Sequence, residues 1–354
     1  MRKLIALVLT LVLCLAAANV VAEGKLVVYT PNPDAEIQFI LNTFAEKYDV
    51  EIEMLSMGTG ECYTRLVAEK DAPIADVMFG GVETTWTHDY PDLFQTYVAN
   101  GNDKLPAEYQ NPDGLITYYI LGGSCVMIVN EELEAELGTK ITCYNDLLNP
   151  ELKGMIASAD PNASSSSFAH LSNILLAMGD GENPYESEAA WNYVAKLIEQ
   201  LDGSLTSGSS AVYKGTANGE YTVGLSYEVG VAGFIANGAQ GVRAVYPTEG
   251  VCWTPVGSAI VNGAKNIDNA KLFMDWLISD ECQTIMATAE GSVLRGVRTD
   301  LFVPTDYMPA FSTLNLKQED SEYTSGNKQT IGGTKILRIR LCFQALCSER
   351  HILQ

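Results

Sequence analysis

Short apolar runs alternate with helical runs over the first 80 residues, and this alternation limits the chain to a small set of folds. Residues 25–29, 50–55 and 75–79 are rich in β-branched and aromatic residues. Residues 37–48 carry apolar side chains at helical spacing, and residues 62–68 form a second helical segment. Strands and helices that alternate at this pace form a parallel sheet with crossover helices, so we predict an α/β fold.

A second unit of the same kind follows later in the chain. Residues 155–159, 221–226 and 242–246 have the composition of strands. Residues 164–178 and 187–201 have the periodicity of helices. These segments therefore predict a second sheet. The chain length of 354 residues also indicates two domains.

Two longer β-rich runs, residues 115–130 and 250–261, flank the second unit. We expect each run to pass from one lobe to the other. The predicted organisation is lobe 1 from residues 23–121 plus 256–324, and lobe 2 from residues 122–255.

The start of the chain is typical of a secretory signal peptide. Two basic residues precede an apolar run over residues 4–15, and small residues end at Ala22. The run is shorter than the roughly 20 residues that span a membrane. We predict that residues 1–22 are cleaved and that the mature protein is periplasmic. A lipid anchor at Cys14 is less favoured, because the bulky Leu13 precedes it.

The chain is strongly acidic, with 22 Lys and Arg against 44 Asp and Glu and a net charge of −22. Such a surface repels polyanions, so we expect no nucleic-acid partner. The eight cysteines are scattered without CxxC or metal-site spacing. We expect most of them to be buried thiols, with one disulfide as an option.

The loops that follow the predicted strands share one chemical character. They contain glycines, which expose backbone N–H groups, and serine or threonine at the start of the next helix; the loops are residues 30–32, 56–60, 80–83, 160–167 and 226–228. Ligands of open α/β sheets bind at this edge, and a helix N-terminus favours an oxyanion. For any single loop, capping of its own helix is the commoner reason for the same residues; several such loops facing one cleft are harder to explain in that way.

Motifs of other functional classes are absent. The chain lacks GxGxxG and the P-loop pattern, so a nucleotide site has no support. His170 lies close to the serines at 164–167, but GxSxG is missing. We therefore predict no enzyme activity, no cofactor and no resident metal.

Six segments together resemble extracellular solute-binding proteins of bacterial ABC importers, in the group of ferric-ion, phosphonate, sugar-phosphate and thiamine binders. The segments are LVVYTPNPDAE (26–36), GTGECYTRLVAEKDAPIADVMFGG (58–81), DLLNPELKG (146–154), DPNASSSS (160–167), LSYEVG (225–230) and AKLFMDWLISDECQ (270–283). The resemblance covers nearly the whole chain from residue 25 to about 300.

The resemblance implies a two-lobed type II periplasmic-binding-protein fold, in which two crossover strands form a hinge. It also implies a monomer that delivers its solute to an inner-membrane ABC permease and its ATPase. The positions that match the family's binding loops are Thr30, Thr59, Gly60, Gly81, Ser165, Ser166, Tyr227 and Glu228.

The ligand class is where this family divides. Ferric binders use adjacent tyrosines, whereas this chain offers Tyr227 preceded by Ser226, and the first loop has no histidine. Hydroxyl and backbone donors suit a small anionic solute, an organophosphate or phosphonate, with Glu83 or Glu228 free to contact hydroxyls or an amine. Ferric iron bound through Tyr227 is the alternative. A surface antigen or adhesin that has lost transport is a second alternative.

The end of the chain departs from the rest in composition. From Ser325 onward, five of the 22 basic residues occur with a single acid. We predict that residues 325–354 are an atypical basic tail, either disordered or the product of a frameshift.

Overall fold

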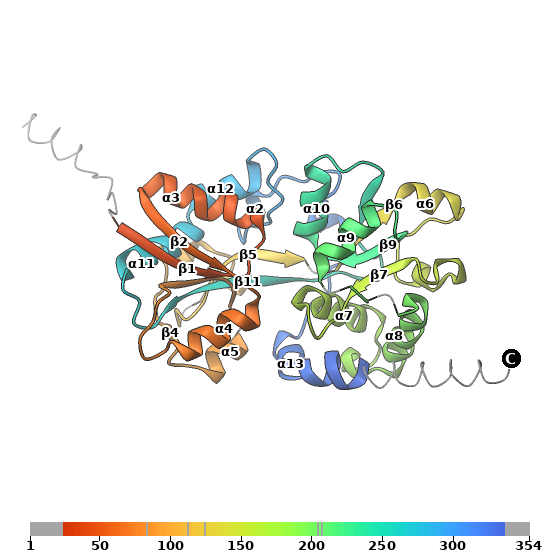
Figure 1. Ribbon diagram of the computed structural model, residues 1–354, viewed down its shortest axis with the longest axis horizontal. Helices are drawn as coiled ribbons and strands as arrows, with labels where there is room; N and C mark the ends of the chain where they lie inside the picture. Colours follow the sequence, from red (N-terminus) through yellow and green to blue (C-terminus); the bar gives the residue numbers. More distant parts are fainter. Residues whose placement is uncertain are drawn as a thin grey trace, which may run out of the picture.

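The structure is a computed structural model that describes residues 24–336 except positions 83, 112, 124, 204 and 207. The chain forms two α/β lobes, each built on its own sheet (Figure 1). The predicted signal peptide lies outside the described residues. No helix within the described part of the chain is long and apolar enough to cross a membrane.

Lobe 1 is built on a six-stranded mixed sheet. Its order is β2 (Val50–Ser56), β1 (Gly24–Thr30), β3 (Val77–Val82), β11 (Trp253–Val261) and β4 (Phe94–Gln95), with β5 (Thr117–Gly123) also paired to β11. Strand β1 is parallel to β2 and β3, whereas β11 runs antiparallel to its neighbours. The three strands predicted near the N-terminus are confirmed.

Lobe 2 is built on a five-stranded sheet. Its order is β10 (Val242–Val245), β6 (Val126–Asn130), β9 (Val223–Ser226), β7 (Ile156–Ala159) and β8 (Leu205–Thr206). Strand β7 is parallel to β8 and β9, and β6 is antiparallel to both of its neighbours. The predicted strands of the second unit are confirmed, while β8 was not predicted.

Helices cover the faces of both sheets. Residues 34–48 form one helix with a π-helical middle, drawn as α2 (Asp34–Glu36) and α3 (Thr43–Tyr48). Its buried Phe44 packs edge-on against Phe273 of lobe 1. Lobe 1 also carries α4 (Thr59–Ala68), α5 (Thr84–Asp89), α11 (Ile267–Leu277) and α12 (Asp280–Thr288); lobe 2 carries α6 (Glu131–Glu136), α7 (Ser165–Met178), α8 (Glu188–Leu201), α9 (Ser209–Ala217) and α10 (Glu228–Ala236).

Two chain crossings join the lobes. The single run predicted over residues 115–130 is split into β5, which belongs to the lobe 1 sheet, and β6, which belongs to the lobe 2 sheet. Strands β5 and β11 are antiparallel, from Ser258 opposite Thr117 to Trp253 opposite Gly123, and lie side by side between the lobes (Figure 1). The predicted two-lobed fold with a pair of crossover strands is confirmed.

The C-terminal part of the described chain corrects two predictions. Residues 316–324 were assigned to lobe 1, but Leu316 pairs with Val251, and Tyr323 stacks on Tyr185 of lobe 2. Residues 325–354 were predicted to be a basic tail, either disordered or the product of a frameshift. Where this tail is described it is helical: its first two residues end α13 (Ser321–Gly326), and a π-helical segment (Gln329–Lys335) follows, whose Ile331 lies buried in the lobe 2 core. This packing contradicts disorder for residues 325–336, and the frameshift stays a prediction. Burial of apolar side chains explains why this stretch is packed; residues 337–354 lie outside the described residues.

A candidate binding cleft between the lobes

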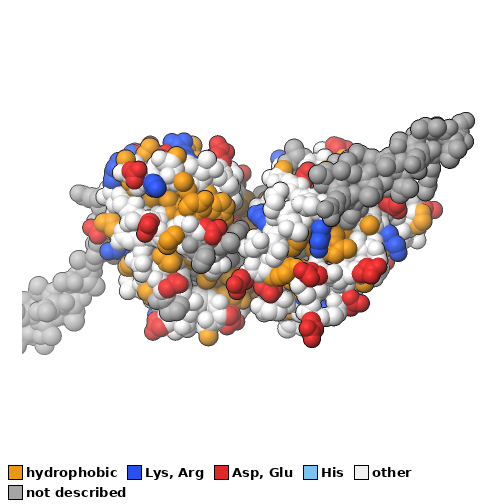
Figure 2. Space-filling view, turned by 90° about the horizontal axis from the view of Figure 1, so that it is seen from below, with side chains coloured by type: hydrophobic (Ala, Val, Ile, Leu, Met, Phe, Trp, Pro, Cys, Tyr) orange, Lys and Arg blue, Asp and Glu red, His pale blue; other side chains and the backbone are white. Residues whose placement is uncertain are grey.

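An open cleft of about 820 Å³ lies between the two lobes and is lined by residues of both. Figure 2 shows the lobes as separate masses with a notch between them and with acidic side chains on both. Six of the eight predicted site residues line the cleft: Thr59, Gly60, Gly81, Ser165, Ser166 and Tyr227. The other two, Thr30 and Glu228, lie elsewhere.

The lobe 1 wall is formed where β3 ends and α4 begins. Thr59 and Gly60 are the first two residues of α4. Gly81 has a φ of +70°, and a Cβ atom there would stand 2.9 Å from Pro31 and 3.1 Å from Thr59. Only glycine allows these two loops to approach so closely at that backbone conformation. The start of α4 therefore faces the cleft with unpaired backbone donors.

Thr30 supports the cleft from beneath. It is fully buried, and its Oγ1 donates to the carbonyl of Phe79 at 2.7 Å and accepts from the backbone N–H of Asn32 at 3.0 Å. The structure therefore gives Thr30 a role in holding the first loop, and Asn32 of that loop lines the cleft in its place.

Glu36 is a cleft residue that the sequence reasoning missed. Its side chain is buried but belongs to the cleft lining. Tyr119 donates to the Glu36 carboxylate at 2.6 Å and accepts from Asn32 at 2.9 Å. Burial raises the pKa of Glu36 to about 7, against the opposing effect of the Tyr119 hydrogen bond. No sequence motif marks such a residue, because its place in the cleft depends on a hydrogen bond from Tyr119, which is distant in the sequence.

The lobe 2 wall is formed by the starts of α7 and α9. Ser164 caps α7 by accepting from the N–H of Ser167, and its hydroxyl lies 3.1 Å from that of Ser166. Capping and cleft lining therefore occur together at this loop. Gly208, Ser209 and Ser210 at the start of α9 also line the cleft. They carry the same glycine and serine signature as the predicted loops, so the sequence does contain a signal for this part of the cleft.

Tyr227 and Glu228 are neighbours with different environments. Tyr227 stands before the first turn of α10, lines the cleft and lies edge-on to Tyr213. Burial raises the pKa of Tyr227, so its hydroxyl is protonated at neutral pH. The Glu228 carboxylate is 1% exposed and forms an ion pair with Arg295. The structure thus does not place Glu228 with the ligand candidates, and Glu83 lies outside the described residues.

The charged side chains of the described cleft lining are Glu36, Glu61 and Lys328. Lys328 comes from the C-terminal stretch, and its ammonium lies 5.3 Å from the centre of the Phe168 ring on α7. The sequence reasoning treated this stretch as separate from the site. Its composition contains no sign of the contact, which depends on the packing of residues 325–336 against lobe 2.

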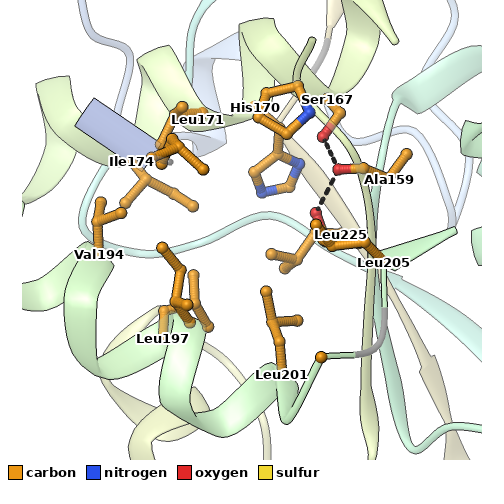
Figure 3. Close-up of a pocket in the computed structure, with 15 residues that line it drawn as sticks. Ala159, Ser167, His170, Leu171, Ile174, Val194, Leu197, Leu201, Leu205 and Leu225 are labelled. Carbon is orange, nitrogen blue, oxygen red and sulfur yellow. Dashed lines mark hydrogen bonds between the residues drawn. The ribbon is translucent and has the colours of Figure 1, made fainter. Parts of the chain in front are cut away.

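A smaller apolar pocket of about 70 Å³ lies inside lobe 2 between β7, α7 and α8 (Figure 3). The His170 ring projects among leucine and isoleucine side chains there (Figure 3). Its Nδ1 is 2.9 Å from the Ser226 carbonyl and its Nε2 is 3.2 Å from the Tyr144 hydroxyl. Burial lowers the pKa of His170 to about 4. Both ring nitrogens therefore have structural partners, and the ring is neutral at pH 7.

Comparisons with known proteins identify the family. The sequence profile described as bacterial extracellular solute-binding protein matches residues 40–302. The chain is 31% identical over 270 residues to an uncharacterized protein of Haemophilus influenzae, covering 75% of each chain. It is 26% identical over 288 residues to a probable ABC transporter periplasmic-binding protein, y4fP, of Sinorhizobium fredii, covering 80% of this chain and 78% of that one.

A solved structure agrees in fold. The periplasmic binding protein AfuA of Actinobacillus pleuropneumoniae, with exogenous fructose-6-phosphate bound, matches with a TM-score of 0.69 and 25% identity, covering 90% of this chain and 97% of that one. The fold and these relatives support a periplasmic solute-binding component of an ABC importer. The chain belongs to the family of bacterial extracellular solute-binding proteins.

Proposed function

We propose that this protein captures a small organophosphate or phosphonate in the interlobe cleft and delivers it to an inner-membrane ABC permease and its ATPase. The observation that carries the proposal is the convergence of four helix starts, those of α4, α7, α9 and α10, on one cleft from both lobes. Each start presents unpaired N–H groups and a partial positive charge. An oxyanion is the ligand that this environment stabilises.

Hydroxyl groups supply the remaining contacts of the proposed site. Thr59, Ser165, Ser166 and Tyr227 line the cleft and each carries a hydroxyl that can donate to a phosphate oxygen. Lys328 adds one positive charge at the edge of lobe 2. The anion would thus be held mainly by neutral donors, in a protein whose net charge is −22.

Two polar residues on the lobe 1 side of the cleft favour a solute that also carries hydroxyl groups. Asn32 and Glu36 line the cleft and are joined to each other through Tyr119. An amide and a carboxyl group can exchange hydrogen bonds with alcohol groups, whereas an apolar floor could not. A phosphorylated sugar or polyol matches both walls, and the fructose-6-phosphate bound to AfuA supports this class.

Closure of the lobes would complete the site. The two walls belong to different sheets, which are connected through the β5 and β11 crossings. A hinge motion would bring the α7 and α9 starts toward the α4 start and exclude water from the anion. Charge-assisted hydrogen bonds to the anion strengthen when water is excluded.

The test is a thermal-shift and calorimetry panel on the mature protein. The panel contains fructose 6-phosphate, glycerol 3-phosphate, 2-aminoethylphosphonate, inorganic phosphate, unphosphorylated fructose and ferric citrate. At a hundredfold excess over Kd, a true ligand should raise the unfolding free energy by about 2.7 kcal/mol. Ser166→Ala and Tyr227→Phe should weaken binding, whereas Thr284→Ala on the exposed face of α12 should leave it unchanged.

Three outcomes would overturn the proposal in favour of a named alternative or leave it without support. A shift with ferric citrate alone would favour iron bound through Tyr227, although no cluster of three His, Cys, Asp or Glu side chains in the described part of the chain is arranged for a metal ion. A shift with fructose alone would exclude the anion. A protein that binds no member of the panel, in a strain whose solute uptake is unchanged by its deletion, would favour the antigen or adhesin.

A further inference from the structure

Two cysteines lie at the junction of the lobes, one on each interlobe connection. Cys125 stands between β5 and β6, and Cys252 directly precedes β11. The antiparallel pairing of the two connections ends with Trp253 opposite Gly123, so both cysteines lie just beyond the last pair. They are 127 positions apart in the sequence, and the fold brings them together.

The Cys125 thiol lies against the backbone of Cys252. Cys125 Sγ donates to the carbonyl oxygen of Cys252 at 3.2 Å, and both residues are free cysteines in the structure. The exposed fractions of the two residues are 0% and 7%. The other described cysteines have different neighbours: Cys62 donates to the carbonyl of Met57, and Cys143 lies beside Asp146.

We propose that Cys125 and Cys252 form a disulfide in the exported protein. The signal-peptide pattern and the extracellular family place the chain where disulfides form and persist. The Cys125 sulfur already lies against the Cys252 backbone, so the bond requires the two side chains to turn toward each other and no movement of one lobe to the other. This inference concerns the lobe junction and does not depend on the identity of the solute.

The oxidation requires a disulfide-carrying oxidant, for which oxidised glutathione is a sufficient model. The Cys125 thiolate attacks one sulfur of the oxidant and forms a mixed disulfide, and one oxidant thiol leaves. The Cys252 thiolate then attacks the Cys125 sulfur and releases the second oxidant thiol. Two protein thiols are thereby oxidised to one disulfide, and one oxidant disulfide is reduced to two thiols.

Burial determines when this reaction can occur. In the folded protein both thiols are screened from an oxidant, and the contact with Cys125 together with burial raises the pKa of Cys252, which lowers its reactivity. Exchange should therefore occur while lobe 2 is still open during folding. Once formed, the bond closes a loop that contains every strand of the lobe 2 sheet, from β6 to β10.

The experiment uses the full protein purified from the exported fraction. Free thiols are blocked with N-ethylmaleimide in denaturant, and the digest is analysed by mass spectrometry with and without prior reduction. We expect a crosslinked peptide pair that contains Cys125 and Cys252 and disappears on reduction. Protein folded in reductant and then exposed to oxidised glutathione should form the pair slowly, whereas protein refolded with the oxidant should form it quickly.

Variants and melting supply an independent readout. Reduction should lower the melting midpoint of the wild type by several degrees, since a long closed loop is released. Cys125→Ala and Cys252→Ala should abolish this response to reduction and free the partner thiol. Cys282→Ala, which removes a buried thiol of lobe 1, should retain it. Full alkylation of both thiols in exported protein and in protein refolded with oxidised glutathione would overturn the proposal without any variant.

Discussion

Arg295 and Glu228 form a buried ion pair across the junction of the two lobes. Arg295 Nε lies 2.9 and 2.8 Å from the two carboxylate oxygens of Glu228, and both residues are 1% exposed. The guanidinium lies 4.2 and 4.6 Å from the ring centres of Phe302 and Phe311. Glu228 is the first residue of α10 in lobe 2. The carbonyl of Arg295 accepts a hydrogen bond from the N–H of Leu121 in β5, a strand of the lobe 1 sheet.

Removal of one partner from this pair should destabilise the protein strongly. Glu228→Ala leaves the Arg295 guanidinium buried without its carboxylate, and we expect a loss of about 3–5 kcal/mol of unfolding free energy. Urea titration followed by circular dichroism measures this loss. Because Tyr227 precedes Glu228 at the start of α10, the same variant should also weaken solute binding.

The matched control is an exposed ion pair in the same region. Arg298 lies 3.0 Å from Asp300, whose side chain is 62% exposed. Asp300→Ala should change the unfolding free energy by no more than about 0.5 kcal/mol. Equal effects of Glu228→Ala and Asp300→Ala would show that the buried pair contributes no more than a surface pair.

Glu36 should make stability depend on pH between about 4.5 and 7. Burial raises its pKa from 4.5 to about 7, so the folded protein binds the Glu36 proton more tightly than the unfolded chain does. The stabilisation is fully present below about pH 4.5 and is lost as pH rises through about 7. The total for this one group is about 3 kcal/mol.

The measurement compares the wild type with Glu36→Gln over that pH range. The amide cannot ionise. As pH rises from about 4.5 to 7, the wild type should therefore lose unfolding free energy relative to Glu36→Gln. Glu61→Gln is the control, because Glu61 is an exposed acid of the same cleft. A constant difference between wild type and Glu36→Gln from pH 4.5 to 7 would show that the Glu36 carboxyl does not titrate there.

The lobes could be predicted from the sequence because their signals are local. Periodicity in residues 37–48 and 187–201 reports which side chains face a core, and those helices are present as α2 to α3 and α8. The division of the β-rich run into β5 and β6 was not predicted. Every residue of β6 is buried, so no alternation marks the change from one sheet to the other.

The candidate site was predictable only where backbone and hydroxyl donors stand at helix starts. Glu228 belongs to such a start, yet its side chain turns to Arg295, 67 residues away along the chain. Glu36 and Lys328 were missed because their positions depend on partners far along the chain, Tyr119 and Phe168. Such contacts have no counterpart in local sequence.

A side chain at position 80 should destabilise the protein, because it would displace a residue of the cleft. Its φ is +85°, and a Cβ atom would stand 1.9 Å from Asn32 Oδ1, so Gly80→Ala must displace the cleft residue Asn32. We expect a cost of about 1–2 kcal/mol for the left-handed backbone and about 1–3 kcal/mol more for the clash. Solute affinity should fall as well.

Gly101→Ala separates the two contributions. Gly101 has a φ of +93° with no atom within 4 Å of the added Cβ, so only the backbone cost applies. Thermal melts and calorimetry on both variants provide the comparison. If Gly101→Ala destabilised the protein as much as Gly80→Ala and Gly80→Ala bound solute normally, the steric account of Asn32 would be wrong.

Lys328 tests whether the C-terminal stretch belongs to the binding site. Its ammonium is the one cation among the described residues of the cleft lining, and Lys328 is an exposed residue. Lys328→Ala should weaken the binding of a phosphorylated solute about two- to five-fold, the range of an exposed charge pair. It should also reduce the dependence of Kd on salt concentration. Lys335→Ala is the matched control, because Lys335 lies 4.6 Å from the Trp191 ring and outside the cleft lining. If Lys328→Ala bound the solute with the same affinity and the same salt dependence as the wild type, Lys328 would not be part of the site. The site would then be limited to the helix starts.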